Sequence, residues 1–177
     1  LAGDAPGACA SVRAMARTSG TTETRQIGFW TAVGCRDWDL GWRLTENLPE
    51  AANAQFQFEC RSAARGWVSK FRGDPAAART AFERAKQVLL DHGKDHPPDS
   101  NHASLLGMVL AELGEKDAAL ESARLALTLR PASNDAWLLQ HRKFDLALVE
   151  IAVGDRAVGL ALLRELLREP SDQVSPA

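Results

Sequence analysis

The chain has 177 residues, of which 45% are hydrophobic and 25% charged, and its net charge is −2. This length and apolar content suit one globular domain, and the nearly neutral balance lacks the basic excess that is typical of a general nucleic-acid binder. Charged residues break every hydrophobic run before it reaches the roughly 20 residues that a membrane-spanning helix needs, so we expect no membrane insertion.

The N-terminal residues, beginning at Leu1, lack the cationic flank and apolar segment of a signal peptide, and we expect the chain to be a piece of a longer protein. The three cysteines, Cys9, Cys35 and Cys60, are odd in number and scattered. Such spacing predicts neither a disulfide framework nor a metal-binding Cys-x-x-Cys pair. We therefore expect all three to be small buried apolar residues.

Apolar residues recur every three or four positions along most of the chain, whereas strand-forming residues are sparse and Tyr is absent. This periodicity is the signature of amphipathic helices and predicts an all-α fold. The clearest helix start has Asp74 as the N-cap and Pro75 in the first helical position. We expect nine helices, at residues 6–17, 22–33, 37–48, 54–72, 75–91, 101–113, 116–129, 134–153 and 155–168.

Glycines recur about every 40 residues between helical segments, at Gly34, Gly73, Gly114 and Gly154. Glycine adopts the left-handed conformation that often ends a helix without the cost that a Cβ imposes, and an acidic residue follows each of these glycines within three positions. Negative charge suits the start of the next helix. We therefore expect four helix pairs and an N-terminal helix, stacked into a right-handed α-solenoid over residues 1–169, with a frayed tail at 170–177.

Residues 59–131 hold two units with a shared pattern of small and large side chains. The pattern resembles the tetratricopeptide repeat, in which small residues let the two helices of a pair approach closely. The units around Gly34 and Gly154 depart from it, as end units of a solenoid do. The residues that carry the resemblance are Gly66, Gly73, Ala78, Phe82 and Ala85 in one unit, and Leu106, Gly107, Leu110, Gly114, Ala119, Ala126 and Pro131 in the next.

The segments 65–79 and 113–120 also look like the tetratricopeptide tails of bacterial signalling proteins, which often follow a kinase, a nucleotide cyclase or a winged-helix region. The resemblance implies a scaffold or sensory module and transfers no catalytic residue. The sequence has no nucleophile elbow, phosphate-binding loop or zinc-protease motif. We expect a non-enzymatic protein without a cofactor.

In tetratricopeptide arrays the first helix of each pair lines the concave face, which implies a candidate binding surface with aromatic and polar side chains. Such a mixture suits an extended peptide or a helix laid in a groove. The alternative is that a neighbouring helix or the chain's own tail covers this face. The candidates are Trp67, Lys70 and Phe71 in one unit, Asn101, Ser104, Met108 and Glu112 in the next, and His141, Phe144 and Leu148 in the third.

Basic residues outnumber acidic ones between Arg61 and Lys86. Arg61 and Arg65 fall on adjacent helical turns and are candidates for binding an anionic segment. The alternative is that their stems pack over apolar neighbours. The other tryptophans, Trp30, Trp38, Trp42 and Trp137, stand at helical spacing and are expected in the core.

Three histidines and three aspartates fall within residues 91–102. They would bind a metal if they converged. However, Gly93 and Pro97 disfavour a continuous helix with His92 and His96 on one face, so we expect a solvated loop and no metal site. Asp99 or Ser100 would then cap the next helix.

The leading hypothesis is an interaction module that binds a protein or peptide partner, and no nucleic acid, on its concave face. One alternative is a small-molecule sensor with an enclosed apolar pocket near Trp67, Phe71, Met108 and Phe144. Another is an array that self-associates into a homo-oligomer. We favour a cytoplasmic location, with a periplasmic one as the alternative if a leader or anchor precedes Leu1.

Overall fold

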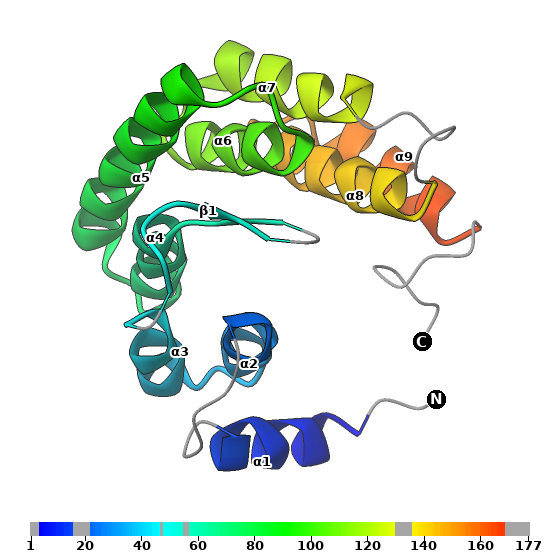
Figure 1. The fold of residues 1–177 in the computed structure, drawn as a ribbon. Helices are drawn as coiled ribbons and strands as arrows, with labels where there is room; N and C mark the ends of the chain where they lie inside the picture. Colours follow the sequence, from blue (N-terminus) through cyan, green and yellow to red (C-terminus); the bar gives the residue numbers. More distant parts are fainter. Residues whose placement is uncertain (1–3, 16–21, 47, 55–56, 130–135, 169–177) are drawn as a thin grey trace. The chain divides into compact units, whose positions relative to one another are not determined.

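The structure is a computed structural model that describes residues 4–15, 22–46, 48–54, 57–129 and 136–168. The described part is mostly helical, which confirms the predicted fold class at that level, and it contains nine helices and two short strands (Figure 1). The elements are α1 (Ala5–Met15), α2 (Thr22–Gly34), α3 (Trp38–Thr45), β1 (Ala52–Asn53), β2 (Phe58–Glu59), α4 (Arg61–Phe71), α5 (Pro75–Asp95), α6 (Ser100–Glu112), α7 (Lys116–Thr128), α8 (Ala136–Ala152) and α9 (Arg156–Leu166).

The predicted helix at 54–72 is wrong in its first part. Helix α4 begins at Arg61, and before it β1 pairs with β2 in a two-stranded sheet. The sequence at 55–58 reads Gln-Phe-Gln-Phe, and alternation with a period of two favours a strand. The helical period therefore holds only from residue 61 onward.

In three of the helix pairs, a glycine with a positive φ angle lies in the turn between the two helices, as predicted. Gly73, Gly114 and Gly154 have φ angles of 82°, 80° and 98°. The unit around Gly34 departs from the pattern, as expected: its turn is shifted by two residues, so that Gly34 is the last residue of α2 and Arg36 takes the positive φ of 56°. Hydrogen bonds from Arg36 N to Val33 O (3.0 Å) and from Asp37 N to Ala32 O (2.9 Å) close this turn.

Acidic side chains begin the helices that follow two of these turns. Asp74 Oδ1 accepts a hydrogen bond from Ala77 N at 2.9 Å, which confirms the predicted cap of α5. Asp37 Oδ1 accepts one from Leu40 N at 3.2 Å and caps α3. These bonds satisfy N–H groups that have no partner within the helix.

The chain divides into two compact units, each of which is described by itself. Unit 1 comprises Leu1–Ala52 and Glu59–Ala85, and unit 2 comprises Asn53–Phe58 and Lys86–Ala177. The boundary falls within α5. The expected single domain at 1–169 stays a prediction, and the expected frayed tail at 170–177 lies outside the described residues.

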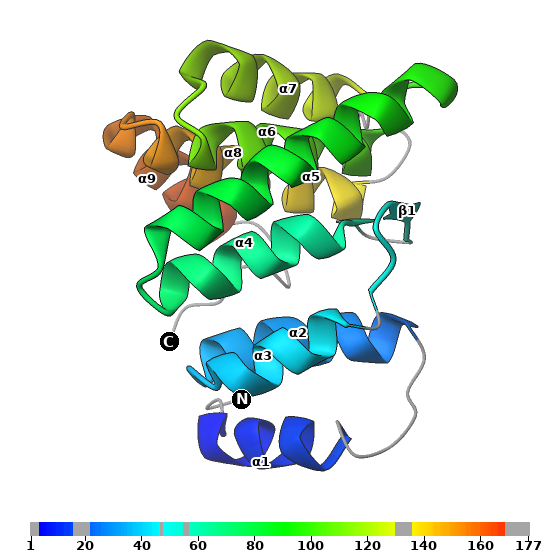
Figure 2. The same cartoon turned by 90° about the vertical axis from the view of Figure 1, so that its left-hand side faces the viewer.

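Unit 1 is built around apolar side chains of α1 to α4. Phe29, Leu48, Ala64 and Val68 form one buried cluster, and residues 12, 32 and 40 form a second. In this unit α4 lies beside α5 (Figure 2). The two helices approach closely at a predicted small residue, since a Cβ on Gly66 would lie 2.5 Å from the ring of Phe82. A larger side chain at Gly66 would force the two helices apart.

A disulfide bond joins Cys9 of α1 to Cys35, which follows α2, with the Cα atoms 5.8 Å apart. The expectation of three buried apolar cysteines is therefore wrong for these two, because helix packing brings together residues whose sequence spacing indicates no pairing. Beside the bond, Arg13 Nε donates to Asp37 Oδ2 at 2.8 Å and lowers the pKa of that carboxyl. Cys60 is buried and free, as expected, and burial raises its pKa to about 11.

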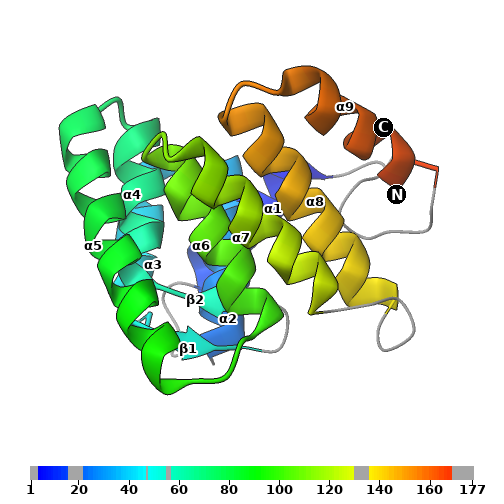
Figure 3. The same ribbon diagram turned by 90° about the horizontal axis from the view of Figure 1, so that it is seen from above.

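Unit 2 packs α6 to α9 around a cluster that includes Leu110, Ala119, Leu146 and Val149. Figure 3 shows α6 beside α7 and α8 beside α9. Ala119 is fully buried, and a Cβ on Gly107 would lie 3.0 Å from Ala119 O. The small residues of the predicted repeat pattern therefore stand where α6 and α7 approach each other most closely.

We predict that Ala119→Trp lowers the free energy of unfolding by about 1–3 kcal/mol or more, because the new ring has no room between α6 and α7. The measurement is urea unfolding followed by circular dichroism. Ala118→Trp is the matched control, since Ala118 is the preceding residue of α7 and is exposed. Equal stability of the two variants would contradict the close crossing.

We predict that reduction of the Cys9–Cys35 bond lowers the free energy of unfolding by about 3.5 kcal/mol, which is the chain-entropy value for a sequence separation of 26 residues. The measurement is chemical unfolding with and without dithiothreitol. The Cys9→Ser/Cys35→Ser variant should match the reduced protein and should not respond to dithiothreitol. If dithiothreitol also lowers the stability of that variant, the loss of stability comes from a group other than the Cys9–Cys35 bond.

Candidate functional site

The candidate site lies at the first turn of α6. Asp99 caps this helix, as expected, and its Oδ1 accepts hydrogen bonds from Asn101 N at 2.8 Å and His102 N at 3.1 Å. Pro97 and Pro98 precede the cap and end the helical path of α5. The cap thus holds the backbone of the first turn in place and positions the side chain of Asn101.

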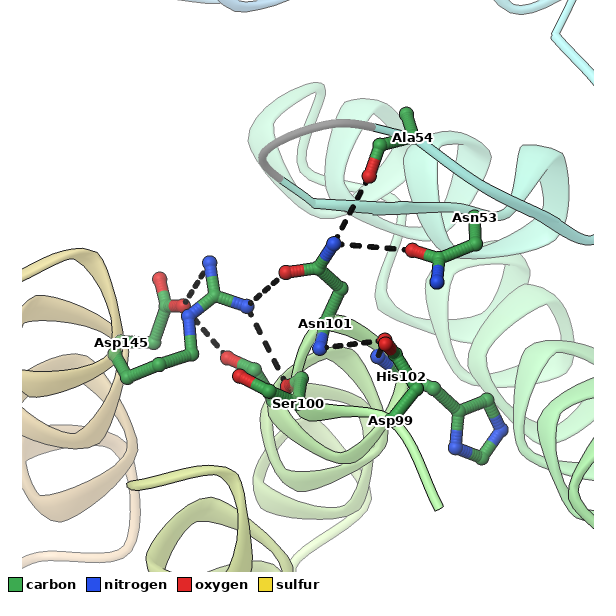
Figure 4. A network of polar contacts seen from close by, with 9 residues as sticks. Asn53, Ala54, Asp99, Ser100, Asn101, His102 and Asp145 are labelled. Carbon is green, nitrogen blue, oxygen red and sulfur yellow. Dashed lines mark hydrogen bonds and ion pairs between the residues drawn. The ribbon is translucent and has the colours of Figure 1, made fainter. Parts of the chain in front are cut away.

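The carboxamide of Asn101 holds the chain at the end of β1, which pairs with β2 (Figure 4). Its Nδ2 donates to Ala54 O at 2.9 Å and to Asn53 Oδ1 at 3.0 Å. Its Oδ1 accepts from Arg142 Nη1 at 3.1 Å. Asn101 is 3% exposed, so these bonds are formed away from solvent. A predicted binding residue of α6 is therefore occupied by a segment from before α4.

A buried ion pair on α8 orients the partner of Asn101. Arg142, which is 3% exposed, lies with Nη2 at 3.2 Å from Asp145 Oδ2, and Ser104 Oγ donates to the same oxygen at 2.6 Å. Burial raises the pKa of Asp145, while Arg142 and Ser104 favour its charged form. Arg142 Nη1 also reaches Ser100 O at 3.4 Å. The network links α6 to α8 through hydrogen bonds and charge.

Sequence reasoning found two members of this network and missed two. Asn101 and Ser104 were predicted as lining residues, and the structure brings them together. Arg142 and Asp145 were not predicted, although a spacing of three residues places them on one face of a helix. An opposite-charge pair in a mostly apolar helix was the signal that would have found them.

An aromatic contact holds β2, the strand that pairs with β1. Phe58 is 4% exposed, and its ring centroid lies 4.8 Å from that of His92 and 5.1 Å from that of His102. Both contacts are edge-to-face, with interplanar angles of 75° and 83°. This geometry is favourable for aromatic rings, so Phe58 serves as an anchor.

The expected solvated loop begins later than predicted, because α5 continues through Gly93 to Asp95 and the exposed loop comprises residues 96–98. The rings of His92 and His96 stack with centroids 3.8 Å apart and an interplanar angle of 5°. A single glycine costs a helix only about 1 kcal/mol, and Pro97 restricts the residue before it rather than the whole preceding turn. Neither breaker was strong enough to end the helix earlier.

The stacked histidines use ring nitrogens for backbone contacts. His96 Nδ1 donates to His92 O at 2.9 Å, and His102 Nε2 donates to Leu89 O at 2.8 Å. Because the two rings are parallel and stacked, their nitrogen lone pairs do not point toward one metal position. Within the described ranges, no group of three or more His, Cys, Asp or Glu side chains is arranged to hold a metal ion.

The other predicted residues of α6 and α8 lie half-buried. Met108 packs against the core cluster of unit 2, and the ring of His141 lies 4.2 Å from that of Trp137. Trp137 is 39% exposed, so its predicted place in the core is wrong. These half-buried positions leave part of each side chain at the surface: Met108, Glu112, His141, Phe144 and Leu148.

In unit 1 the predicted lining residues differ in exposure. Trp67 is 7% exposed and packs against Trp30 (5.4 Å) and Phe82 (5.7 Å). Phe71 is 45% exposed and stacks on Trp38, and Lys70 is exposed. Trp30 is 40% exposed, so its predicted core position is also wrong. Helical spacing shows which residues share a face, but the neighbours of that face decide its burial.

The two candidate anion-binding arginines make contacts inside unit 1. Arg61 Nε donates to Leu48 O at 2.8 Å, and Arg65 Nε donates to Thr45 Oγ1 at 3.2 Å. The guanidinium of Arg65 also lies 5.0 Å from the ring centroid of Trp42. These contacts agree with the alternative in which the arginines pack over their neighbours, and anion binding stays a prediction.

Comparison with protein-family models gives no match for this chain, and comparison with curated proteins gives none either. The resemblance to tetratricopeptide repeats therefore depends on the residues and the geometry described above. No helix in the described part of the chain combines the length and apolar character that crossing a membrane requires.

We predict that unit 2 loses stability as the pH falls below 6.5. Burial and the imidazoles of His96 and His102 lower the pKa of His92 from its ordinary value of 6.5, although Asp95 and Asp99 oppose the shift. Below pH 6.5 the unfolded chain therefore binds more protons at His92 than the folded chain does. Stability is full above pH 6.5 and is lost as the pH falls through the lower folded pKa.

The measurement is urea unfolding between about pH 7.5 and about pH 5.5. His92→Phe keeps an aromatic ring without the titrating nitrogens and should reduce the pH dependence. His141→Gln is the control, because His141 lies outside the stack, and it should keep the dependence of the parent. If the stability of His92→Phe depends on pH as strongly as that of the parent, His92 is not the source of the pH dependence.

Proposed function

We propose that this protein is a non-enzymatic interaction module that binds an extended peptide segment of a partner on the face formed by α6 and α8. The observation that carries the proposal is the hydrogen bond from Asn101 Nδ2 to the backbone carbonyl of Ala54. A side-chain amide that holds a main-chain carbonyl recognises extended backbone independently of its side chains.

The proposal includes a solenoid of tetratricopeptide-like helix pairs. Three pairs, α4/α5, α6/α7 and α8/α9, share a turn with a left-handed glycine. Each also has a small residue at a close helix crossing. A Cβ on Gly66, Gly107 or Gly159 would lie 2.5, 3.0 or 2.6 Å from the nearest atom. Repetition of both features favours a repeat architecture over an unrelated bundle.

Helix α8 offers further groups that suit a peptide. Exposed Trp137 and half-buried His141 and Phe144 lie on α8 and supply aromatic contacts. Aromatic side chains of this kind contribute large contact area at interfaces, while buried polar groups fix the register. The scaffold or sensory role in a bacterial signalling protein, which the resemblance implies, belongs to the same proposal.

The Cys9–Cys35 bond bears on where the module works. Disulfide bonds persist in oxidising compartments and are rare in the cytosol. The bond therefore supports the periplasmic alternative over the cytoplasmic location favoured by the sequence. We include an oxidising compartment in the proposal.

A displayed library of random linear peptides tests this function. The oxidised full chain should select peptides whose affinity, measured by fluorescence anisotropy, falls about tenfold or more in Asn101→Ala and in Phe144→Ala, since one lost hydrogen bond or aromatic contact costs about 1.4 kcal/mol. Glu121→Ala is the control, because Glu121 is exposed on α7. Selected peptides that bind both site variants as tightly as the parent would place the binding surface elsewhere.

A further inference from the structure

Helix α1 makes little apolar contact with the rest of unit 1. Among its described side chains, Val12 is the one that is buried, at 3% exposed. Val12 packs with Ala32 of α2 and Leu40 of α3. One buried valine removes only a small apolar area from water for a helix of 11 residues. Apolar packing therefore holds α1 weakly.

Polar contacts add little to this packing. Arg13 Nε donates to Asp37 Oδ2 at 2.8 Å, but the side chain of Arg13 is 56% exposed. Exposed ion pairs contribute little to stability because water screens them. A single helix of fewer than about 12 residues is also marginal in water, so α1 needs the rest of unit 1 to stay helical. The main connection between α1 and α2, apart from the chain itself, is the Cys9–Cys35 bond.

We propose that the Cys9–Cys35 bond is a redox-sensitive latch on α1. While the bond is intact, α1 covers the side chains of Ala32 and Leu40. When a dithiol reduces the bond, α1 detaches and unfolds, and this apolar surface of α2 and α3 becomes exposed. The latch belongs to unit 1 and does not depend on peptide binding by α6 and α8.

The reduction is a thiol–disulfide exchange with a dithiol. Cys9 and Cys35 are both partly exposed, which opens the bond to a reductant from solvent. One thiolate of the dithiol attacks a sulfur of the bond, and one cysteine leaves as a thiolate that takes up a proton. The second thiolate of the dithiol then breaks the mixed disulfide and frees the other cysteine. Two electrons and two protons thus pass to the cysteines, and the dithiol becomes a disulfide.

The third cysteine does not compete in this exchange. Cys60 is buried, and burial raises the pKa of its thiol to about 11. At neutral pH Cys60 therefore stays protonated, and a protonated thiol is not the nucleophilic form. The exchange is confined to the reductant and the Cys9–Cys35 bond.

The remainder of unit 1 keeps its own contacts when α1 leaves. Asp37 Oδ1 still accepts from Leu40 N and caps α3, because Arg13 uses the other carboxylate oxygen. The described members of the cluster around Phe29 and Val68 come from outside α1. Local opening of this kind needs less free energy than unfolding of the whole unit.

Hydrogen exchange of the full chain, measured by mass spectrometry, tests the latch. The oxidised chain is compared with the chain after treatment with dithiothreitol. We expect the amides of α1 to exchange at least about tenfold faster after reduction, while those of α4 change by less than about twofold. Reoxidation should restore the slow exchange of α1.

Two variants separate the latch from other effects of dithiothreitol. In Cys9→Ser/Cys35→Ser, α1 should exchange as in the reduced parent, with or without dithiothreitol. Cys60→Ala is the matched control, because it removes the buried cysteine and keeps the latch, and it should respond to dithiothreitol as the parent does. Iodoacetamide should label Cys9 and Cys35 after reduction and should leave the buried Cys60 unmodified.

Unchanged exchange in α1 after complete reduction overturns the inference, because packing alone would then hold the helix. Equal acceleration in α1 and α4 also overturns it, because unit 1 would then unfold as a whole. A chain purified in air without the Cys9–Cys35 bond, or a bond that dithiothreitol reduces only in denaturant, has the same consequence. None of these outcomes bears on peptide binding by α6 and α8.

Discussion

The side-chain amide of Asn101 connects three separate parts of unit 2. It donates to Asn53 and Ala54, accepts from Arg142 of α8 and extends from the capped first turn of α6. A buried carboxamide is costly unless its donors and acceptor are paired, so each of these parts constrains the other two. The Arg142–Asp145 ion pair has the same requirement, because neither charge tolerates burial without its partner.

Phe58 of β2 adds a second constraint, which depends on pH. Phe58 contacts His92 and His102, and the low pKa of His92 reflects burial and its imidazole neighbours. Acidification therefore acts on the anchor of Phe58, whereas the amide contact of Asn101 carries no titrating proton.

Much of the helical layout follows from local rules. Glycines at Gly73, Gly114 and Gly154, and acidic caps such as Asp74 and Asp99, mark helix ends that the structure reproduces. Helix ends and turns were harder to predict where several weak conformational preferences compete. Gly93 lies within a helix, the turn after Gly34 moves to Arg36, and the alternation at 55–58 is too short to outweigh the helical period around it.

The sequence by itself determined the mainly helical class, the turn glycines and the small residues at close crossings, because these depend on backbone conformation and on side-chain size. Only the tertiary structure decided that Cys9 meets Cys35, that Trp67 is buried while Trp30 is exposed, and that Asn53 and Ala54 lie against Asn101 of α6. Each of these outcomes depends on which faces meet between segments distant in the chain. Sequence periodicity shows which residues share one face of a helix, but the packing of distant segments decides what covers that face.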